Sequence, residues 1–306
     1  MSQKRWLAIV LAIAIFVFSF VSIETVKNVV SAIQGDKAAA TALLDQFDNQ
    51  DEALTEQIIH KGNSKKRIVI LNIDGTIVNN PQSATNGYDH EIILEELTAI
   101  KKDQTIGGVL LVLNSPGGGA YESNQVRERL LEIQKTQAIP IYVAMKNIAT
   151  GGSYFIATSG DKLFASNETI TGFIQATMKN ADSPNKEVVQ KTTNDSYLRF
   201  LDIVSQSREI PKDKITALAD GRIFNGNEAK KNGLIDEIGN EQDALAVLMN
   251  DHQLEDAEVF MYQPSNPTVS NMMTDKMLQI LQLKNEQEQQ PNVSDIPQMM
   301  YLYGGE

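Results

Sequence analysis

The sequence of 306 residues contains no cysteine, one tryptophan and three histidines. Without cysteine the chain has no thiolate nucleophile, no cysteine-ligated zinc and no disulfide, and its redox compartment cannot be inferred. Basic residues are also few, since 27 lysines and arginines stand against 39 aspartates and glutamates, for a net charge of −12. Such a surface repels a phosphate backbone, so nucleic acid is not expected as a partner.

The few histidines limit the chemistry further. His60 lies in a polar break, His90 precedes a predicted helix and His252 lies in the last predicted helix, each away from any turn that could carry a nucleophile. A Ser-His-Asp triad is therefore not supported, and we expect no metal and no other cofactor. A hydroxyl nucleophile would need another base, and a lysine whose pKa is lowered by burial could serve.

One long apolar run stands near the N-terminus. Residues 6–23 (WLAIVLAIAIFVFSFVSI) carry no charge and match the roughly 17–25 residues of a membrane-spanning helix. Lys4 and Arg5 precede the run, so the positive-inside rule predicts a cytoplasmic N-terminus and an extracytoplasmic main domain. A cleaved signal peptide is the alternative, but the run is longer than the usual apolar region and no Ala-x-Ala follows closely. We expect residues 1–23 to be a single-pass anchor in the cell membrane.

The rest of the chain divides into three parts. Apolar residues three and four apart predict a helical stalk or linker over residues 24–65. Residues 66–263 alternate apolar runs with amphipathic patterns, which predict strands at 68–73, 108–114, 139–145 and 258–263 and helices at 91–100, 124–133, 185–206, 211–219 and 241–250. Uninterrupted apolar strands joined by helices indicate an α/β domain with a largely parallel sheet.

Residues 264–306 form a polar tail with an apolar end. The run QLKNEQEQQPN is too polar to order itself alone, whereas the final IPQMMYLYGGE is apolar and aromatic. Two interpretations remain open for this end. It docks as a strand on the body of its own or a neighbouring subunit, or it lies in a peptide groove.

Two turns rich in small residues are candidates for chemistry. The first, NSPGGG at 114–119, follows a predicted strand, and its glycines let backbone N–H groups point at an anion or a developing oxyanion. Nucleotide binding is disfavoured because the spacing fits neither GxxxxGK[ST] nor GxGxxG. The second, ATGGSY at 149–154, opens a helix, so the hydroxyl of Thr150 is either a helix N-cap or a nucleophile.

Three motifs together carry a resemblance to a known family. SPGGGAYES at 115–123, IPIYVAM at 139–145 with the Gly-Gly turn after it, and DGRIFNGNEAKKNGLIDEIG at 220–239 resemble peptidase family S49, the signal peptide peptidases. The resemblance covers roughly residues 66–263, together with the anchor and the YLYG ending. It implies a Clp/crotonase-like fold, a homo-oligomeric ring and a Ser/Lys dyad that hydrolyses remnant signal peptides or other apolar peptides at a membrane.

The resemblance also assigns roles to residues. Thr150 stands where the family has its nucleophilic serine, and Lys179, four residues before Ser183, is the expected base, although the segment that carries it is shorter than in the family. Gly118 and Gly151 match the backbone positions of the oxyanion hole. Ser153 offers an alternative hydroxyl one turn later, and Gly117 supports the first turn.

Threonine at the nucleophile position leaves the activity open. Its β-methyl group restricts χ1 and crowds attack, so a dyad with threonine is expected to be slower than one with serine. The sequence therefore allows an active endopeptidase or an inactive pseudopeptidase that binds peptides. An acyl-thioester enzyme on the same fold is a third possibility, which an extracytoplasmic location without coenzyme A disfavours.

Overall fold

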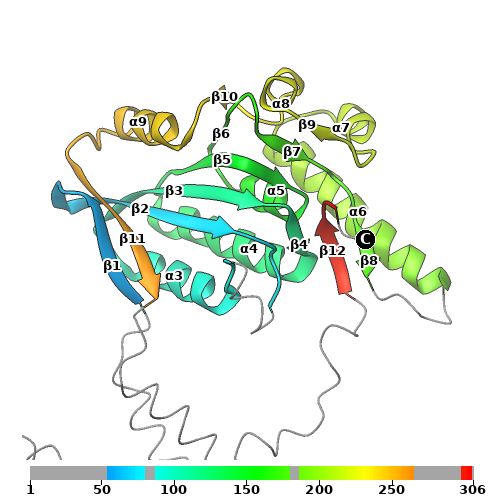
Figure 1. Ribbon diagram of the computed structural model, residues 1–306, viewed down its shortest axis with the longest axis horizontal. Coiled ribbons are helices and arrows are strands. Elements are labelled where there is room, and N and C mark those ends of the chain that lie inside the picture. Colours follow the sequence, from blue (N-terminus) through cyan, green and yellow to red (C-terminus); the bar gives the residue numbers. More distant parts are fainter. Residues whose placement is uncertain (1–53, 80–86, 180–185, 265–297, 305–306) are drawn as a thin grey trace, which may run out of the picture. The chain divides into compact units, whose positions relative to one another are not determined.

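The computed structural model describes residues 54–79, 87–179, 186–264 and 298–304, and all of these belong to one compact unit (Figure 1). The predicted anchor at 6–23 and the first part of the predicted stalk lie outside the described residues. Within the described ranges, no helix is both long enough and apolar enough to cross a membrane.

A largely parallel sheet forms the centre of the unit, as the sequence predicts. Its strand order is β1-β11-β2-β3-β5-β6-β10, with β7 and β9 attached beside β5. The central strands β2 (Asn63–Asp74), β3 (Ile106–Ser115) and β5 (Ile141–Thr150) are parallel neighbours, and they contain the three apolar runs read from the sequence. The next strand outward is β6 (Lys162–Ala165).

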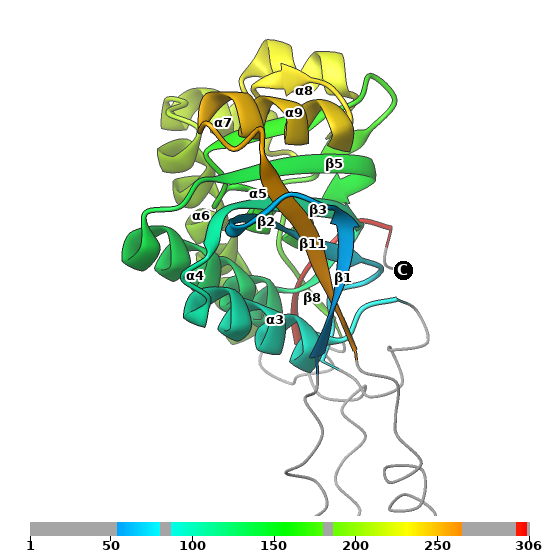
Figure 2. The same ribbon diagram turned by 90° about the vertical axis from the view of Figure 1, so that its left-hand side faces the viewer.

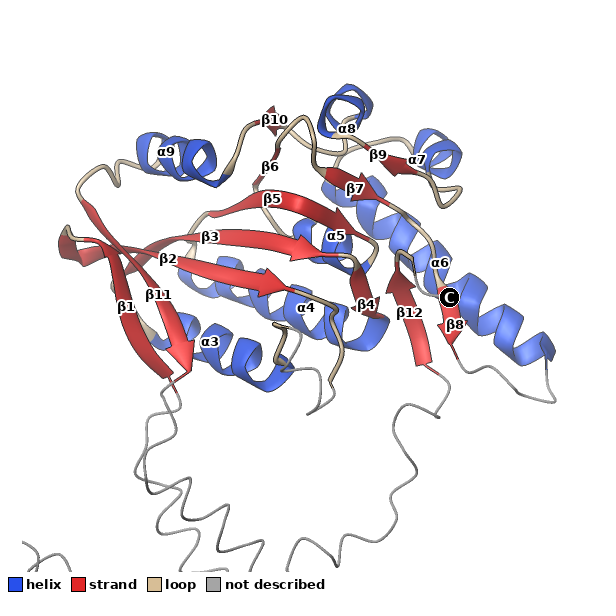
Figure 3. Cartoon of the chain, viewed as in Figure 1, coloured by secondary structure: helices blue, strands red, loops and turns tan. Residues whose placement is uncertain are grey.

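Helices cover the two faces of this sheet unequally (Figures 2 and 3). Alternate residues of β2 and β3, such as Val69 and Leu111, point to the main core, which the helices α3 (His90–Lys102), α4 (Ala120–Gln137) and α5 (Gly152–Ala157) complete. The residues between them, such as Ile68 and Leu110, face a smaller core under α9 (Glu241–Asp251). Beyond the sheet lie α6 (Lys186–Ser207) and α7 (Lys212–Leu218).

Short elements complete the unit at the carboxyl ends of the central strands. A three-stranded sheet has the order β4-β12-β8, formed by β4 (Gly117–Gly119), β12 (Gln298–Leu302) and β8 (Thr177–Lys179). The remaining elements are β7 (Ile170–Gly172), β9 (Ile223–Phe224), α8 (Gly226–Asn232) and β10 (Glu237–Ile238).

The predicted helical linker is wrong over its last residues. Leu54–His60 form an edge strand, β1, that pairs antiparallel with β11 (Ala257–Pro264), so the folded unit begins before residue 66. Leu54 and Ile58, which suggested a helix, are four residues apart, and an even spacing also places two side chains on one face of a strand. The free edge of β11 decided between the two.

Candidate functional site

The glycine turn is held in a fixed conformation between two backbone segments. Gly117 has φ +95°, and its N–H donates to the buried Ser115 hydroxyl at 3.1 Å. On one side Ile77 donates its N–H to the Gly117 carbonyl at 2.9 Å and accepts the N–H of Gly119 at 2.7 Å. Those bonds leave the backbone of Gly118 facing the opposite side, where β12 pairs with it.

Thr150, the predicted nucleophile, lies beside this turn. It is the last residue of β5, it is fully buried, and its hydroxyl donates to the carbonyl of Pro116 at 3.2 Å. The next residue, Gly151, has φ +54°, and its N–H donates to the Gly172 carbonyl at 2.9 Å. This N–H, predicted to line an oxyanion hole, is therefore committed to the sheet in this arrangement.

Ser153, the alternative hydroxyl, is also fully buried, in the first turn of α5. Its Oγ has no hydrogen-bond partner among the described residues. It has no acceptor that could serve as a base in this arrangement, so Thr150 remains the better placed hydroxyl.

The C-terminal strand fills the space in front of both turns. β12 pairs antiparallel with β4 on one side, with Tyr301 opposite Gly118, and with β8 on the other, with Met299 opposite Met178 (Figure 1). Both interpretations of the apolar end thus hold, because the segment docks as a strand and this strand lies between the segments predicted to carry catalysis.

The carbonyl of Tyr301 marks the centre of the site. A Cβ atom placed on Gly117 would lie 2.1 Å from this oxygen, and one on Gly151 would lie 2.2 Å from it. Only glycine allows a peptide carbonyl to come so close to both turns. The Tyr301 carbonyl therefore lies where a substrate carbonyl would meet Thr150 and the N–H of Gly118.

The predicted base lies on the far side of the same strand. Lys179 ends β8, and its backbone pairs with Gln298, three residues before Tyr301. At about 3.3 Å per residue, the two pairing positions are about 10 Å apart along β12. The tail strand thus bridges the two predicted catalytic segments, but it pairs Lys179 with a residue well before the central carbonyl.

The Tyr301 side chain enters a buried aromatic pocket. Its ring centroid lies 5.3 Å from that of Phe155 on α5 and 4.8 Å from that of Phe200 on α6. Its hydroxyl donates to the carbonyl of Ser196 at 3.0 Å, and burial raises the pKa of Tyr301. The phenol is therefore neutral at ordinary pH and acts as a hydrogen-bond donor.

Histidine and metal chemistry find no support in the described ranges. His90 is buried, with Nδ1 2.6 Å from the Tyr88 hydroxyl and Nε2 2.8 Å from Oε1 of Gln125, so both ring nitrogens have structural partners. Nowhere in the described part of the chain do three or more His, Cys, Asp or Glu side chains gather in a way that could hold a metal ion.

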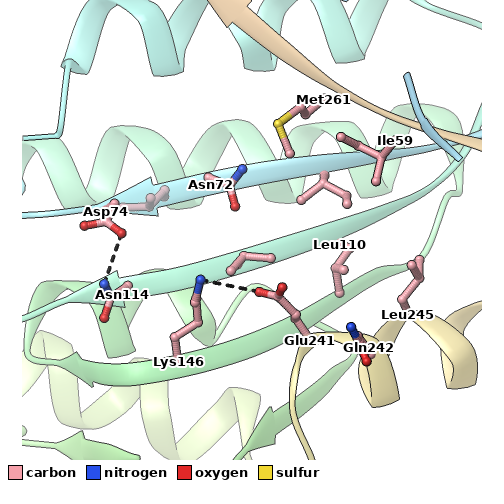
Figure 4. Close-up of a pocket in the computed structure, with 13 residues that line it drawn as sticks. Ile59, Asn72, Asp74, Leu110, Asn114, Lys146, Glu241, Gln242, Leu245 and Met261 are labelled. Carbon is pink, nitrogen blue, oxygen red and sulfur yellow. Dashed lines mark hydrogen bonds and ion pairs between the residues drawn. The ribbon is translucent and has the colours of Figure 1, made fainter. Parts of the chain in front are cut away.

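A second cavity, of about 560 Å³, lies on the sheet face that α9 covers in part (Figure 4). Apolar residues such as Leu110 and Met261 line it together with polar groups, among them Lys146, which pairs with Glu241 at 3.6 Å. None of the predicted catalytic residues lines this cavity. The chemistry proposed from the sequence therefore belongs to the groove that β12 occupies.

Comparison with known proteins agrees with the motifs. The family model described as "Peptidase family S49" matches residues 133–183 and 174–255. The chain is 32% identical, over the whole length of both proteins, to the "Putative signal peptide peptidase SppA" of Enterococcus faecium. This chain belongs to peptidase family S49. It is also 28% identical to "Protease 4" of Haemophilus influenzae, over 80% of this chain and 45% of that one.

One solved structure related to this S49 chain is a ClpP1 mutant from Listeria monocytogenes. It aligns with 58% of this chain and 94% of its own length, at 18% identity and a TM-score of 0.43.

The most specific S49 motif, residues 220–239, has a structural role. Asn225 and Glu228 form a capping box at the start of α8, and Gly233 ends that helix with φ +81°. Asp236 accepts the N–H of Leu163 at 2.8 Å and pairs with Arg208 at 2.6 Å. The fixed spacing of this motif thus reflects a helix with both ends capped and a carboxylate that anchors the chain beside β6.

Proposed function

We propose that this S49 chain is a membrane-anchored endopeptidase that binds apolar peptides as an added strand between β4 and β8 and cleaves them with a hydroxyl/lysine dyad. The supporting observation is the position of the Tyr301 carbonyl, close to both glycine turns and next to Thr150. Main-chain pairing of this kind accepts many sequences, which suits an enzyme that removes remnant signal peptides.

In this proposal each group has one task. Thr150 Oγ1 attacks the substrate carbonyl while Lys179 takes the proton and later returns it to the leaving amine. The N–H of Gly118 stabilises the oxyanion. Gly151 would contribute only after its bond to Gly172 breaks, and that requirement lowers the expected rate.

The location and assembly are part of the same proposal. The charge-free run at 6–23 anchors the chain, Lys4 and Arg5 keep the N-terminus cytoplasmic, and the peptidase unit acts outside the membrane. A Clp/crotonase-like fold and a homo-oligomeric ring follow from the family. An apolar groove near the bilayer would meet peptides that remain in the membrane.

The test is cleavage of an apolar peptide by the full chain in detergent. We expect slow turnover that Thr150→Ala and Lys179→Ala each abolish, whereas Thr150→Ser, which removes the β-methyl group, raises the rate about tenfold or more. Ser153→Ala is the matched control and should leave the rate nearly unchanged. Turnover that survives both alanine variants would refute the dyad.

An inactive peptide-binding protein is the second candidate. Two observations favour it: the Gly151 N–H is committed to Gly172, and the Lys179 backbone pairs three residues away from the central carbonyl. In that case the native chain binds apolar peptides without cleaving them. Detectable turnover by the native chain, lost in Thr150→Ala, would exclude this candidate.

A further inference from the structure

The pocket that holds Tyr301 has a shape and a polarity of its own. Tyr301 is 3% exposed, and the rings that flank it, Phe155 and Phe200, are 1% and 0% exposed. Phe155 and Phe200 also contact each other in an edge-to-face arrangement, with centroids 5.2 Å apart. The walls are thus rigid and aromatic, and they match the flat ring of the residue between them.

The inner end of the pocket is polar. The Tyr301 hydroxyl donates to the main-chain carbonyl of Ser196, at 3.0 Å, on α6. A phenylalanine in the same place would fill the pocket but would leave this partly buried carbonyl without the phenol donor. A buried acceptor that loses its donor costs free energy, so such a pocket discriminates between two rings of nearly equal size.

The register of β12 connects this pocket to the reacting bond. The carbonyl that approaches Gly117 and Gly151 belongs to Tyr301 itself, the same residue whose side chain enters the pocket. In a substrate that binds in this register, the pocket therefore receives the side chain immediately before the scissile bond. The next side chain, at the position of Leu302, follows that bond.

We propose that the pocket formed by Phe155, Phe200 and the Ser196 carbonyl selects tyrosine at the residue before the scissile bond, ahead of phenylalanine and far ahead of small residues. The proposal rests on the binding groove of the proposed function and adds its side-chain preference. The preferred ligands are extended apolar peptides with a tyrosine, and the C-terminal strand of this chain is one of them.

Binding measured apart from turnover tests this preference. The full chain carries Tyr301→Asp, because a carboxylate in the aromatic pocket expels the chain's own strand. Fluorescence anisotropy then follows the binding of the labelled peptides QMMYL, QMMFL and QMMAL. We expect QMMFL to bind about three- to tenfold more weakly than QMMYL, and QMMAL about a hundredfold more weakly.

A pair of variants assigns the preference to the pocket. Phe200→Leu should reduce the ratio between QMMYL and QMMAL about tenfold. Phe173→Leu is the matched control and should keep that ratio, because Phe173 contacts Tyr303 at 5.2 Å and not Tyr301. If Phe200→Leu does not fold, the three peptides on the unchanged pocket still decide.

The outcomes separate this proposal from the proposed function. Equal affinities for the three peptides, a tighter complex with QMMFL than with QMMYL, or no binding at all would overturn the tyrosine preference. The expected order without any cleavage would support the pocket and count against the endopeptidase. Cleavage without the expected order would do the reverse.

Discussion

Glu96 should make the stability of this S49 domain depend on pH. It lies on α3 and is 7% exposed, and burial raises its pKa from 4.5 to about 8. The charged form is disfavoured because a carboxylate loses its hydration inside the protein. The folded chain therefore keeps a proton on Glu96 at pH values at which the unfolded chain has lost it.

The size of the effect follows from this window. Between pH 4.5 and about 8 only the unfolded chain ionises Glu96, so the folded state binds more protons and its stability falls as pH rises. Each pH unit in the window costs up to about 1.4 kcal/mol. We expect a total loss of about 2–5 kcal/mol between pH 4.5 and 8, and none of it from this group below pH 4.5.

Urea unfolding of the wild-type chain and of Glu96→Gln, at pH values from 4.5 to 8, measures this loss. Glutamine does not titrate, so the stability of the variant relative to wild type should rise by about 2–5 kcal/mol across the window. Glu95→Gln, at the exposed neighbouring position, is the matched control and should show no such trend. A stability difference between Glu96→Gln and wild type that stays constant with pH would refute the reasoning.

Three further predictions concern other parts of the unit. Arg67→Met leaves three carboxylates without their shared cation and should cost about 2–4 kcal/mol in urea unfolding, whereas Lys101→Met, in an exposed pair, should cost under about 1 kcal/mol. Gly151→Ala places a methyl group 2.2 Å from the Tyr301 carbonyl, so hydrogen exchange of β12 should accelerate; Gly304→Ala, with positive φ but open space, should not accelerate it, and equal effects would refute the clash. Asp236→Ala removes a buried acceptor and should lower the free energy of unfolding by about 2–3 kcal/mol; a cost near zero would contradict the anchoring role of that carboxylate.

The sequence predicted much of the fold because its signals are local. The apolar runs of β2, β3 and β5 and the amphipathic patterns of α3 and α4 each report the burial of one element, and their alternation suffices for a largely parallel sheet. The motif at 220–239 was equally informative, since helix caps and their partners lie a few residues apart. The family membership follows from the same local spacing.

Other features were decided by contacts between residues far apart in the chain. Leu54–His60 became a strand because β11, about 200 residues later, offered a free edge, and no local pattern reports such a partner. The same holds for the hydrogen bond that commits the N–H of Gly151 to Gly172. Sequence spacing alone could place this glycine in the turn but could not say where its N–H points.

The sequence by itself determined the residue types at the site: a hydroxyl on Thr150, glycines that permit close backbone approach, and an apolar, aromatic end to the tail. Only the tertiary structure decided that this end pairs with Gly118 on one side and with the strand of Lys179 on the other. Strand pairing uses main-chain groups that every residue carries, so its register leaves little trace in the sequence. The aromatic pocket fixes that register, because it takes the side chain of Tyr301 and with it sets which carbonyl meets the glycine turns.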